Sequence, residues 1–138
     1  MPQFSQRSRD RLATCHPDLF VVFSEVVKTW DCTIIEGART REQQAEYVRA
    51  GKSKTMHSKH LPQSDGLSHA VDVAPYPIDW ADGRGFAYFA GYVKATAERL
   101  REQGRISHGL RWDGDWDGDG NVREHSFFDG PHYELIGD

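Results

Sequence analysis

The sequence lacks a long hydrophobic run and contains only two cysteines. Its longest apolar stretch, Leu19–Val27, is interrupted by Ser24 and Glu25 and falls well short of the roughly 20 apolar residues of a membrane-spanning helix. The start of the chain is polar and shows no apolar core of a signal peptide, so we expect no leader and synthesis in a cytoplasm. Cys15 and Cys32 match neither a disulfide framework nor a CxxC metal motif, and we expect both to be reduced and buried.

An excess of positive charge is also missing. The formal net charge is −4, which disfavours a nucleic-acid partner. With 38% hydrophobic and 28% charged residues, the composition is that of an ordinary globular protein and argues against disorder. The 138 residues contain no repeat, low-complexity tract or linker. We therefore expect a single domain over residues 1–138, and a monomer.

The hydrophobic pattern predicts a mixture of helices and strands. Apolar residues at helical spacing and capping signals indicate helices at 8–14, from 17 towards 30, at 41–50 and at about 85–103. Short β-rich or alternating segments indicate strands at 32–35, 70–74, 110–112 and 131–136. The elements do not alternate as βαβ units, so we expect an α+β fold with a mainly antiparallel sheet flanked by helices. Residues 51–69 show no period, and long irregular loops are often functional.

Histidines and carboxylates are the residue types that bind catalytic zinc. They occur in the irregular segment 51–69, in the expected strand 70–74 and in the expected last strand 131–136. The candidates are His57, His60, His69, Asp72, His132 and Glu134. Asp72 interrupts the apolar strand AVDVA, so its carboxylate faces either water on an edge strand or a cation or metal in a buried one. A lone histidine at the start of a strand, such as His132, is more often structural than a metal ligand. The spacing alone leaves both alternatives open.

Three short motifs occur in a specific order. They are Ser58-Lys59-His60, the segment AVDVAP at 70–75 and the segment DGPHYE at 129–134. Together with CHPDL at 15–19 and EGART at 36–40, this set resembles the zinc peptidases that include D-alanyl-D-alanine carboxypeptidases and L-alanyl-D-glutamate endopeptidases. These families share a metal-binding core with the hedgehog signalling domain. The chain is most similar to small phage endolysins, and the resemblance covers nearly its whole length.

The resemblance implies a zinc site on the sheet, with His60, Asp72 and His132 as ligands. It also implies that Asp129 is the general base and that Arg39 faces the reacting carbonyl group. Ser58 and Gln44 are further candidates, because their polar side chains could bind polar groups of the substrate.

Two assignments have rivals. Eleven residues separate His60 from Asp72, more than is usual in the family, which makes His69 an alternative ligand. His69 is three residues from Asp72, so the two side chains would point to opposite faces of a regular strand, and we prefer His60. Glu134 competes with Asp129 as the base because it shares a strand face with His132. We prefer Asp129 by its family position and expect Glu134 to orient a ligand.

The acidic loop DGDWDGDGN at 113–121 predicts a calcium site, because so many neighbouring carboxylates repel one another unless a cation neutralises them. One register satisfies the calcium-loop pattern D-x-D-x-D-G-x5-E through Asp113, Asp115, Asp117, Gly118 and Glu124. A shifted register fits the resemblance better and assigns the ion to Asp115, Asp117, Asp119 and Asn121. An uncomplexed, solvated turn remains the alternative.

The sequence thus predicts a zinc peptidase of the endolysin type that cuts the L-alanyl-D-glutamate bond of the peptidoglycan peptide, with regulatory calcium as a second ion. Such an enzyme would stay in the host cytoplasm until lysis and then act on the periplasmic cell wall. The alternatives are a D-alanyl-D-alanine carboxypeptidase or dipeptidase, and a non-catalytic binding module stabilised by zinc and calcium.

Overall fold

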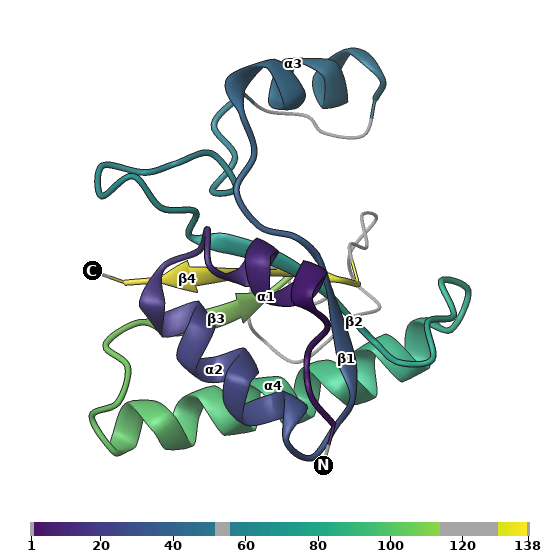
Figure 1. Ribbon diagram of the computed structural model, residues 1–138, viewed down its shortest axis with the longest axis vertical. Helices are drawn as coiled ribbons and strands as arrows, with labels where there is room; N and C mark the ends of the chain where they lie inside the picture. Colours follow the sequence, from purple (N-terminus) through teal and green to yellow (C-terminus); the bar gives the residue numbers. More distant parts are fainter. Residues whose placement is uncertain (1, 52–55, 114–129, 138) are drawn as a thin grey trace.

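The computed structural model describes residues 2–51, 56–113 and 130–137. Along these residues the elements follow the order that the sequence predicts (Figure 1). They are α1 (Gln6–Leu12), α2 (Pro17–Val27), β1 (Cys32–Glu36), α3 (Arg41–Arg49), β2 (Ala70–Pro75), α4 (Gly83–Glu102), β3 (Gly109–Trp112) and β4 (His132–Ile136).

Side chains at the helix starts explain where the helices begin. Ser5 and Asp82 each accept a backbone N–H of the first turn, at the starts of α1 and α4. Thr40 forms a capping box with Gln43 at the start of α3, which satisfies backbone donors that the helix itself leaves unpaired. At the start of α2, His16 accepts the N–H of Asp18, so this histidine has a structural role in addition to any other.

The strands form one antiparallel sheet in the order β1-β2-β4-β3. The α+β fold class with a mainly antiparallel sheet is therefore confirmed. In the central pair, Asp72 of β2 lies opposite His132 of β4. On the other side of β2, Glu36 lies opposite Asp72, after an irregularity in β1 that follows Ile34. Such irregularities re-aim the side chains that follow them.

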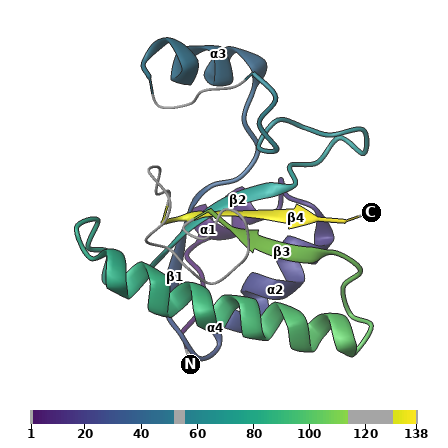
Figure 2. The same cartoon turned by 180° about the vertical axis from the view of Figure 1, so that it is seen from behind.

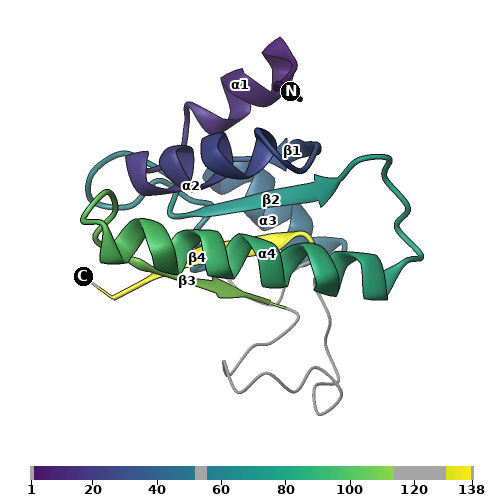
Figure 3. The same ribbon diagram turned by 90° about the horizontal axis from the view of Figure 1, so that it is seen from below.

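Helices α2 and α4 cover one face of the sheet, whereas α3 lies on the opposite side (Figures 1 and 2). Figure 3 shows α4 running along the sheet on the side away from α3. The hydrophobic core fills the space between the sheet and α2 and α4, with Phe23 and Phe89 from the helices and Val71, Val73 and Tyr133 from the strands fully buried. Because side chains alternate along a strand, Asp72, His132 and Glu134 project from the face opposite this core.

Two further expectations can be compared with the structure. Cys15 and Cys32 are both buried and free, as the sequence predicts, and burial raises the pKa of each thiol to about 12, so both are protonated at neutral pH. Within the described ranges, no helix combines the length and the apolar character that crossing a membrane requires.

Candidate active site

Three predicted ligands meet on the polar face of the sheet. His60 Nε2 lies 3.1 Å from Asp72 Oδ1 and 3.2 Å from His132 Nδ1. His132 Nδ1 lies 3.1 Å from the same Asp72 oxygen. The three side chains thus offer one nitrogen or oxygen atom each at a common point. We call His60, Asp72 and His132 the central cluster.

Strand pairing and one loop bring the central cluster together. Asp72 and His132 are opposite each other in the antiparallel pair, so their side chains are neighbours on one face. His60 comes from the loop before β2 and is 1% exposed. Its ring Nδ1 lies 2.7 Å from the carbonyl oxygen of Gly37, and its backbone N–H donates to Ser58 Oγ. Gly37 itself packs so closely against the end of α1 that a Cβ atom there would collide with the Arg11 carbonyl and the Thr14 hydroxyl.

The hydrogen bonds determine which nitrogen carries a proton. A carbonyl oxygen only accepts, so Nδ1 of His60 must donate to Gly37. This leaves Nε2 as the ring atom of His60 that faces the cluster. His132 contacts acceptors at both nitrogens, namely Asp72 Oδ1 at Nδ1 and Glu134 Oε1 at Nε2, the latter at 3.0 Å. Without an ion, His132 is therefore held in its doubly protonated form.

The electrostatics of the cluster agree with this assignment. Burial alone would lower the pKa of His132, but hydrogen bonds to Asp72 and Glu134 and the charge of Asp113 outweigh it and raise the pKa to about 10. Burial would raise the pKa of Asp72, but its hydrogen bonds and charge interactions with His132 and His60 reverse this effect and lower the pKa well below its ordinary range. The proton on Nδ1 of His132 thus lies where a metal ion would bind the three converging ligand atoms of His60, Asp72 and His132.

The donor set fits a zinc ion. Two imidazole nitrogens and one carboxylate oxygen are among the ligands that catalytic zinc uses, and such sites keep a fourth position open. When Nδ1 of His132 binds a cation, its Nε2–H can still donate to Glu134, which is the carboxylate–histidine–metal arrangement that fixes the orientation of a ligand. His60 has the equivalent support from Gly37.

Glu134 is held by positive charges rather than left available. Its Oε2 accepts from Arg111 Nη2 at 2.8 Å and lies 3.5 Å from Lys59 Nζ. Burial would raise the pKa of Glu134, but His132, Arg111 and Lys59 outweigh it and lower the pKa to about 2. A carboxylate whose pKa is so low is a weak proton acceptor. The contacts favour an orienting function for Glu134.

Arg39 lies beside the cluster in a fixed arrangement. Its backbone N–H donates to the carbonyl oxygen of His60, and its guanidinium group donates from Nε to Glu36 Oε1 and from Nη1 to Gln44 Oε1, both at 2.7 Å. The guanidinium carbon lies 4.4 Å from the centre of the Tyr47 ring, and the Tyr47 hydroxyl donates to Glu36 Oε2. The residues around Arg39 therefore restrain its position on several sides.

Gln44 differs from the sequence expectation in its surroundings. The side chain is fully buried, and its carbonyl oxygen receives the Arg39 donor. The structure thus places Gln44 behind Arg39 instead of at an open surface. Glu36 and Tyr47 were missed by sequence reasoning, although the EGART segment contains Glu36 and supplied a usable signal.

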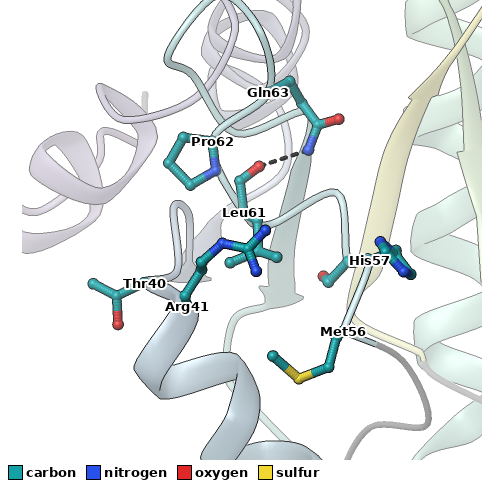
Figure 4. Close-up of a pocket in the computed structure, with 8 residues that line it drawn as sticks. Thr40, Arg41, Met56, His57, Leu61, Pro62 and Gln63 are labelled. Carbon is teal, nitrogen blue, oxygen red and sulfur yellow. Dashed lines mark hydrogen bonds between the residues drawn. The ribbon is translucent and has the colours of Figure 1, made fainter.

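Ser58 lines a cavity between the start of α3 and the loop that carries His60 (Figure 4). The cavity has a volume of about 480 Å³. Its lining consists of Thr40, Arg41, Met56, His57, Ser58, Leu61, Pro62 and Gln63. Two of these residues directly follow Arg39 in the chain, and Ser58 accepts a hydrogen bond from the backbone of His60. The cavity is therefore adjacent to the segments that hold the cluster.

The remaining expected residues lie elsewhere. His69, the rival ligand, contacts Asp65 at 2.8 Å and is absent from the central cluster. The expected base Asp129 and the expected calcium ligands Asp115, Asp117, Asp119 and Asn121 lie outside the described residues. Asp113, the first residue of the alternative calcium register, is described and places Oδ2 3.6 Å from His132 Nε2.

Comparison with known proteins identifies the family. The family model of the phage L-alanyl-D-glutamate peptidases matches residues 1–136. The chain belongs to this family. The L-alanyl-D-glutamate peptidase of Escherichia phage T5 is 31% identical over 145 residues, with 97% of this chain and 98% of that protein covered. The L-alanyl-D-glutamate peptidase of Listeria phage A118 is 33% identical over 105 residues, which span 74% of this chain and 29% of that longer protein.

A solved structure supports the same conclusion. The L-Ala D-Glu endopeptidase ChiX of Serratia marcescens is 31% identical, with a TM-score of 0.72 and coverage of 98% of this chain and 91% of that one. The family, the fold and the enzyme class expected from the sequence, a peptidase of the L-alanyl-D-glutamate type, are therefore confirmed. The metal and the functions of the individual residues remain predictions.

Proposed function

We propose that this member of the family is a zinc-dependent endolysin that hydrolyses the bond between L-alanine and D-glutamate in the peptide of bacterial peptidoglycan. The observation that carries the zinc dependence is the convergence of His60, Asp72 and His132 on one point of the sheet. Membership of the family supports the choice of bond. As an endolysin, the protein would wait in the host cytoplasm and reach the cell wall at lysis.

In this proposal, the central cluster holds the zinc ion. When bound, zinc supplies a Lewis acid that polarises the scissile carbonyl group and makes a water molecule acidic enough to attack near neutral pH. Glu134 accepts the Nε2–H of His132 and keeps that ring oriented, and Gly37 does the same for His60. Lys59 and Arg111 in turn hold Glu134 in its ionised form.

Arg39 stabilises negative charge in the transition state. The oxygen of the attacked carbonyl gains charge as the tetrahedral species forms, and a preorganised cation stabilises that charge without reorganising. Glu36 and Gln44 use some of the guanidinium donors of Arg39, and an arginine has five N–H donors in total. We propose that Gln44 positions Arg39 and that Ser58, at the wall of the cavity, contacts the peptide.

Asp129 takes the proton of the attacking water in this proposal. Its position three residues before His132 in the sequence tethers it to a ligand, and a base must be within hydrogen-bond reach of the proton that it accepts. The low pKa of Glu134 supports this choice between the two carboxylates.

The proposal is tested by digesting purified muropeptides with the zinc-loaded chain and identifying the products by mass spectrometry. We expect a new free amino group on D-glutamate. Asp72→Asn should abolish cleavage, whereas Asp10→Asn, an exposed aspartate on α1, is the matched control. Release of terminal D-alanine would instead support a D-alanyl-D-alanine carboxypeptidase, and intact peptide with the zinc-loaded chain would contradict catalysis altogether.

A further inference from the structure

A second group of histidines lies at the start of β2, before Ala70. Three imidazole rings pack against one another in T-shaped pairs, with centre-to-centre distances of 5.0 Å between His16 and His69, 4.8 Å between His16 and His108, and 6.0 Å between His69 and His108. The topology explains the meeting. β2 and β3 both begin at the end of the sheet where β4 finishes, so His69 and His108, which immediately precede them, lie at that end. The backbone N–H of His16 donates to Ser68 and brings the third ring alongside.

His16 and His69 of this group and the nearby Asp65 each place one possible ligand atom within 4.8 Å of the others. We propose that these three residues bind a second divalent transition-metal ion of the zinc class. Two imidazoles and a carboxylate are ligands that such ions accept, and three protein ligands with water at the fourth position make a complete tetrahedral site. The donors of one tetrahedral zinc ion lie about 3.3 Å apart, given bonds of about 2.0–2.2 Å, so small side-chain movements suffice.

The location favours ion entry and separates this site from the central cluster. The side chains of His16, His69 and Asp65 are 19%, 21% and 38% exposed, so an ion and its water can reach them. His69 is three residues from Asp72 along the chain, a distance of roughly 10 Å in a strand, and the two groups of possible ligands share no residue. Partial burial also lowers the pKa of His16 from its ordinary value, which favours the neutral ring that metals bind.

The neighbouring group of His16, Asp18 and His108 is a less suitable site. Asp18 Oδ2 already accepts hydrogen bonds from the backbone N–H groups of Ser107 and His108 and lies 2.7 Å from His108 Nδ1. This carboxylate therefore stabilises the turn before β3. Asp65 divides its contacts between its two oxygens: Oδ1 accepts the backbone N–H of Leu67, whereas Oδ2 has His69 as its hydrogen-bond partner among the described residues. An ion on Oδ2 would therefore displace a single hydrogen bond of Asp65 and leave the bond to Leu67 in place.

Ion binding has one specific consequence for α2. Nδ1 of His16 accepts the N–H of Asp18 at 2.9 Å. A neutral imidazole has only one lone pair in the ring plane, so Nδ1 cannot keep that hydrogen bond when either ring nitrogen binds the ion. Binding should therefore release the Asp18 amide. In return, the ion would join the start of α2 to the turn before β2, where Asp65 and His69 are 49 and 53 residues from His16 in the sequence.

The test is a zinc titration of the full, uniformly ¹⁵N-labelled chain, followed by NMR of the histidine ring nitrogens and the backbone amides. We expect ring signals of His16 and His69, and the amide of Asp18, to shift together with one equivalent of zinc. Ring signals of His60 and His132 respond to the central cluster and are read separately, so the failure of one site leaves the other result interpretable. Ring signals of His16 and His69 that stay in place at saturating zinc would overturn the proposal.

A count of bound ions provides an independent check. His69→Gln keeps a donor for Asp65 and removes a ligand, so after dialysis against low micromolar zinc it should hold one ion fewer per chain than the wild type. His57→Gln is the matched control, because it removes an exposed histidine outside the group. Equal zinc contents in the wild type and His69→Gln would also overturn the proposal.

Discussion

The stability of the metal-free chain should depend on pH through His132. Its folded-state pKa is about 10, compared with 6.5 for the ordinary side chain. A raised pKa means that the folded state holds the proton more tightly than the unfolded chain. The stabilisation is therefore fully present below pH 6.5 and is lost as the pH rises towards 10. Removing zinc with a chelator and raising the pH should weaken the fold.

The expected size follows from the two pKa values. Between pH 6.5 and pH 8.5 the unfolded chain releases its proton from this residue while the folded chain keeps it. At about 1.36 kcal/mol per pH unit, the loss in the free energy of unfolding is about 2 kcal/mol over this window. Among the described residues, the other groups with shifted pKa values act outside this window. The lowered pKa of His16 affects stability at more acidic pH, and the thiols of Cys15 and Cys32, with pKa values of about 12 compared with 9.0, act at more alkaline pH.

Urea denaturation at about pH 6.5, 7.5 and 8.5, in the presence of a chelator, measures how the free energy of unfolding depends on pH. The variant His132→Gln is the control and should show a flat profile over the same window, because it lacks the titrating ring. Saturating zinc should remove or reverse the loss, since an ion on Nδ1 competes with the proton. A metal-free wild type that is equally stable at all three pH values would refute the assignment of a trapped proton to His132.

Three further predictions concern catalysis. Asp129→Ala should keep its zinc but cleave roughly 10²–10⁴-fold more slowly, the usual contribution of a general base. If the variant cleaves at the wild-type rate, another residue is the general base. Gln44→Ala should lower kcat by about tenfold to a hundredfold because Arg39 loses an acceptor that positions it, and Gln44→Glu, which retains an acceptor, should restore much of the rate. Calcium should raise the lytic activity of the zinc-loaded chain on permeabilised cells, and Asp117→Ala combined with Asp119→Ala should blunt this response; a flat calcium titration would leave the acidic loop as a solvated turn.

Local sequence patterns were sufficient for most of the fold. Helical spacing of apolar residues predicted α2 and α4, and alternation in AVDVA predicted β2. These patterns work because burial on one face imposes a period on the sequence. The same reasoning identified Asp72 as a carboxylate in an otherwise apolar strand, and the structure places it against two histidines.

Contacts between distant segments were beyond sequence reasoning. The choice between His60 and His69 depends on the path of an irregular loop, which is set by the bond of His60 to Gly37 and by the close approach of Gly37 to α1. Gln44 was expected to bind polar groups of the substrate, whereas in the structure its side chain is fully buried and accepts a hydrogen bond from the guanidinium group of Arg39. Tyr47 also belongs to the site through contacts between segments, because its hydroxyl donates to Glu36 and its ring lies beside Arg39.

The central claim is that His60, Asp72 and His132 hold the zinc ion of the peptidase reaction. Anomalous scattering at the zinc absorption edge, from crystals of the zinc-loaded chain, tests it most directly. We predict a strong peak within about 2.0–2.2 Å of His60 Nε2, Asp72 Oδ1 and His132 Nδ1. A zinc-loaded, active crystal with no peak among these three atoms would contradict the claim.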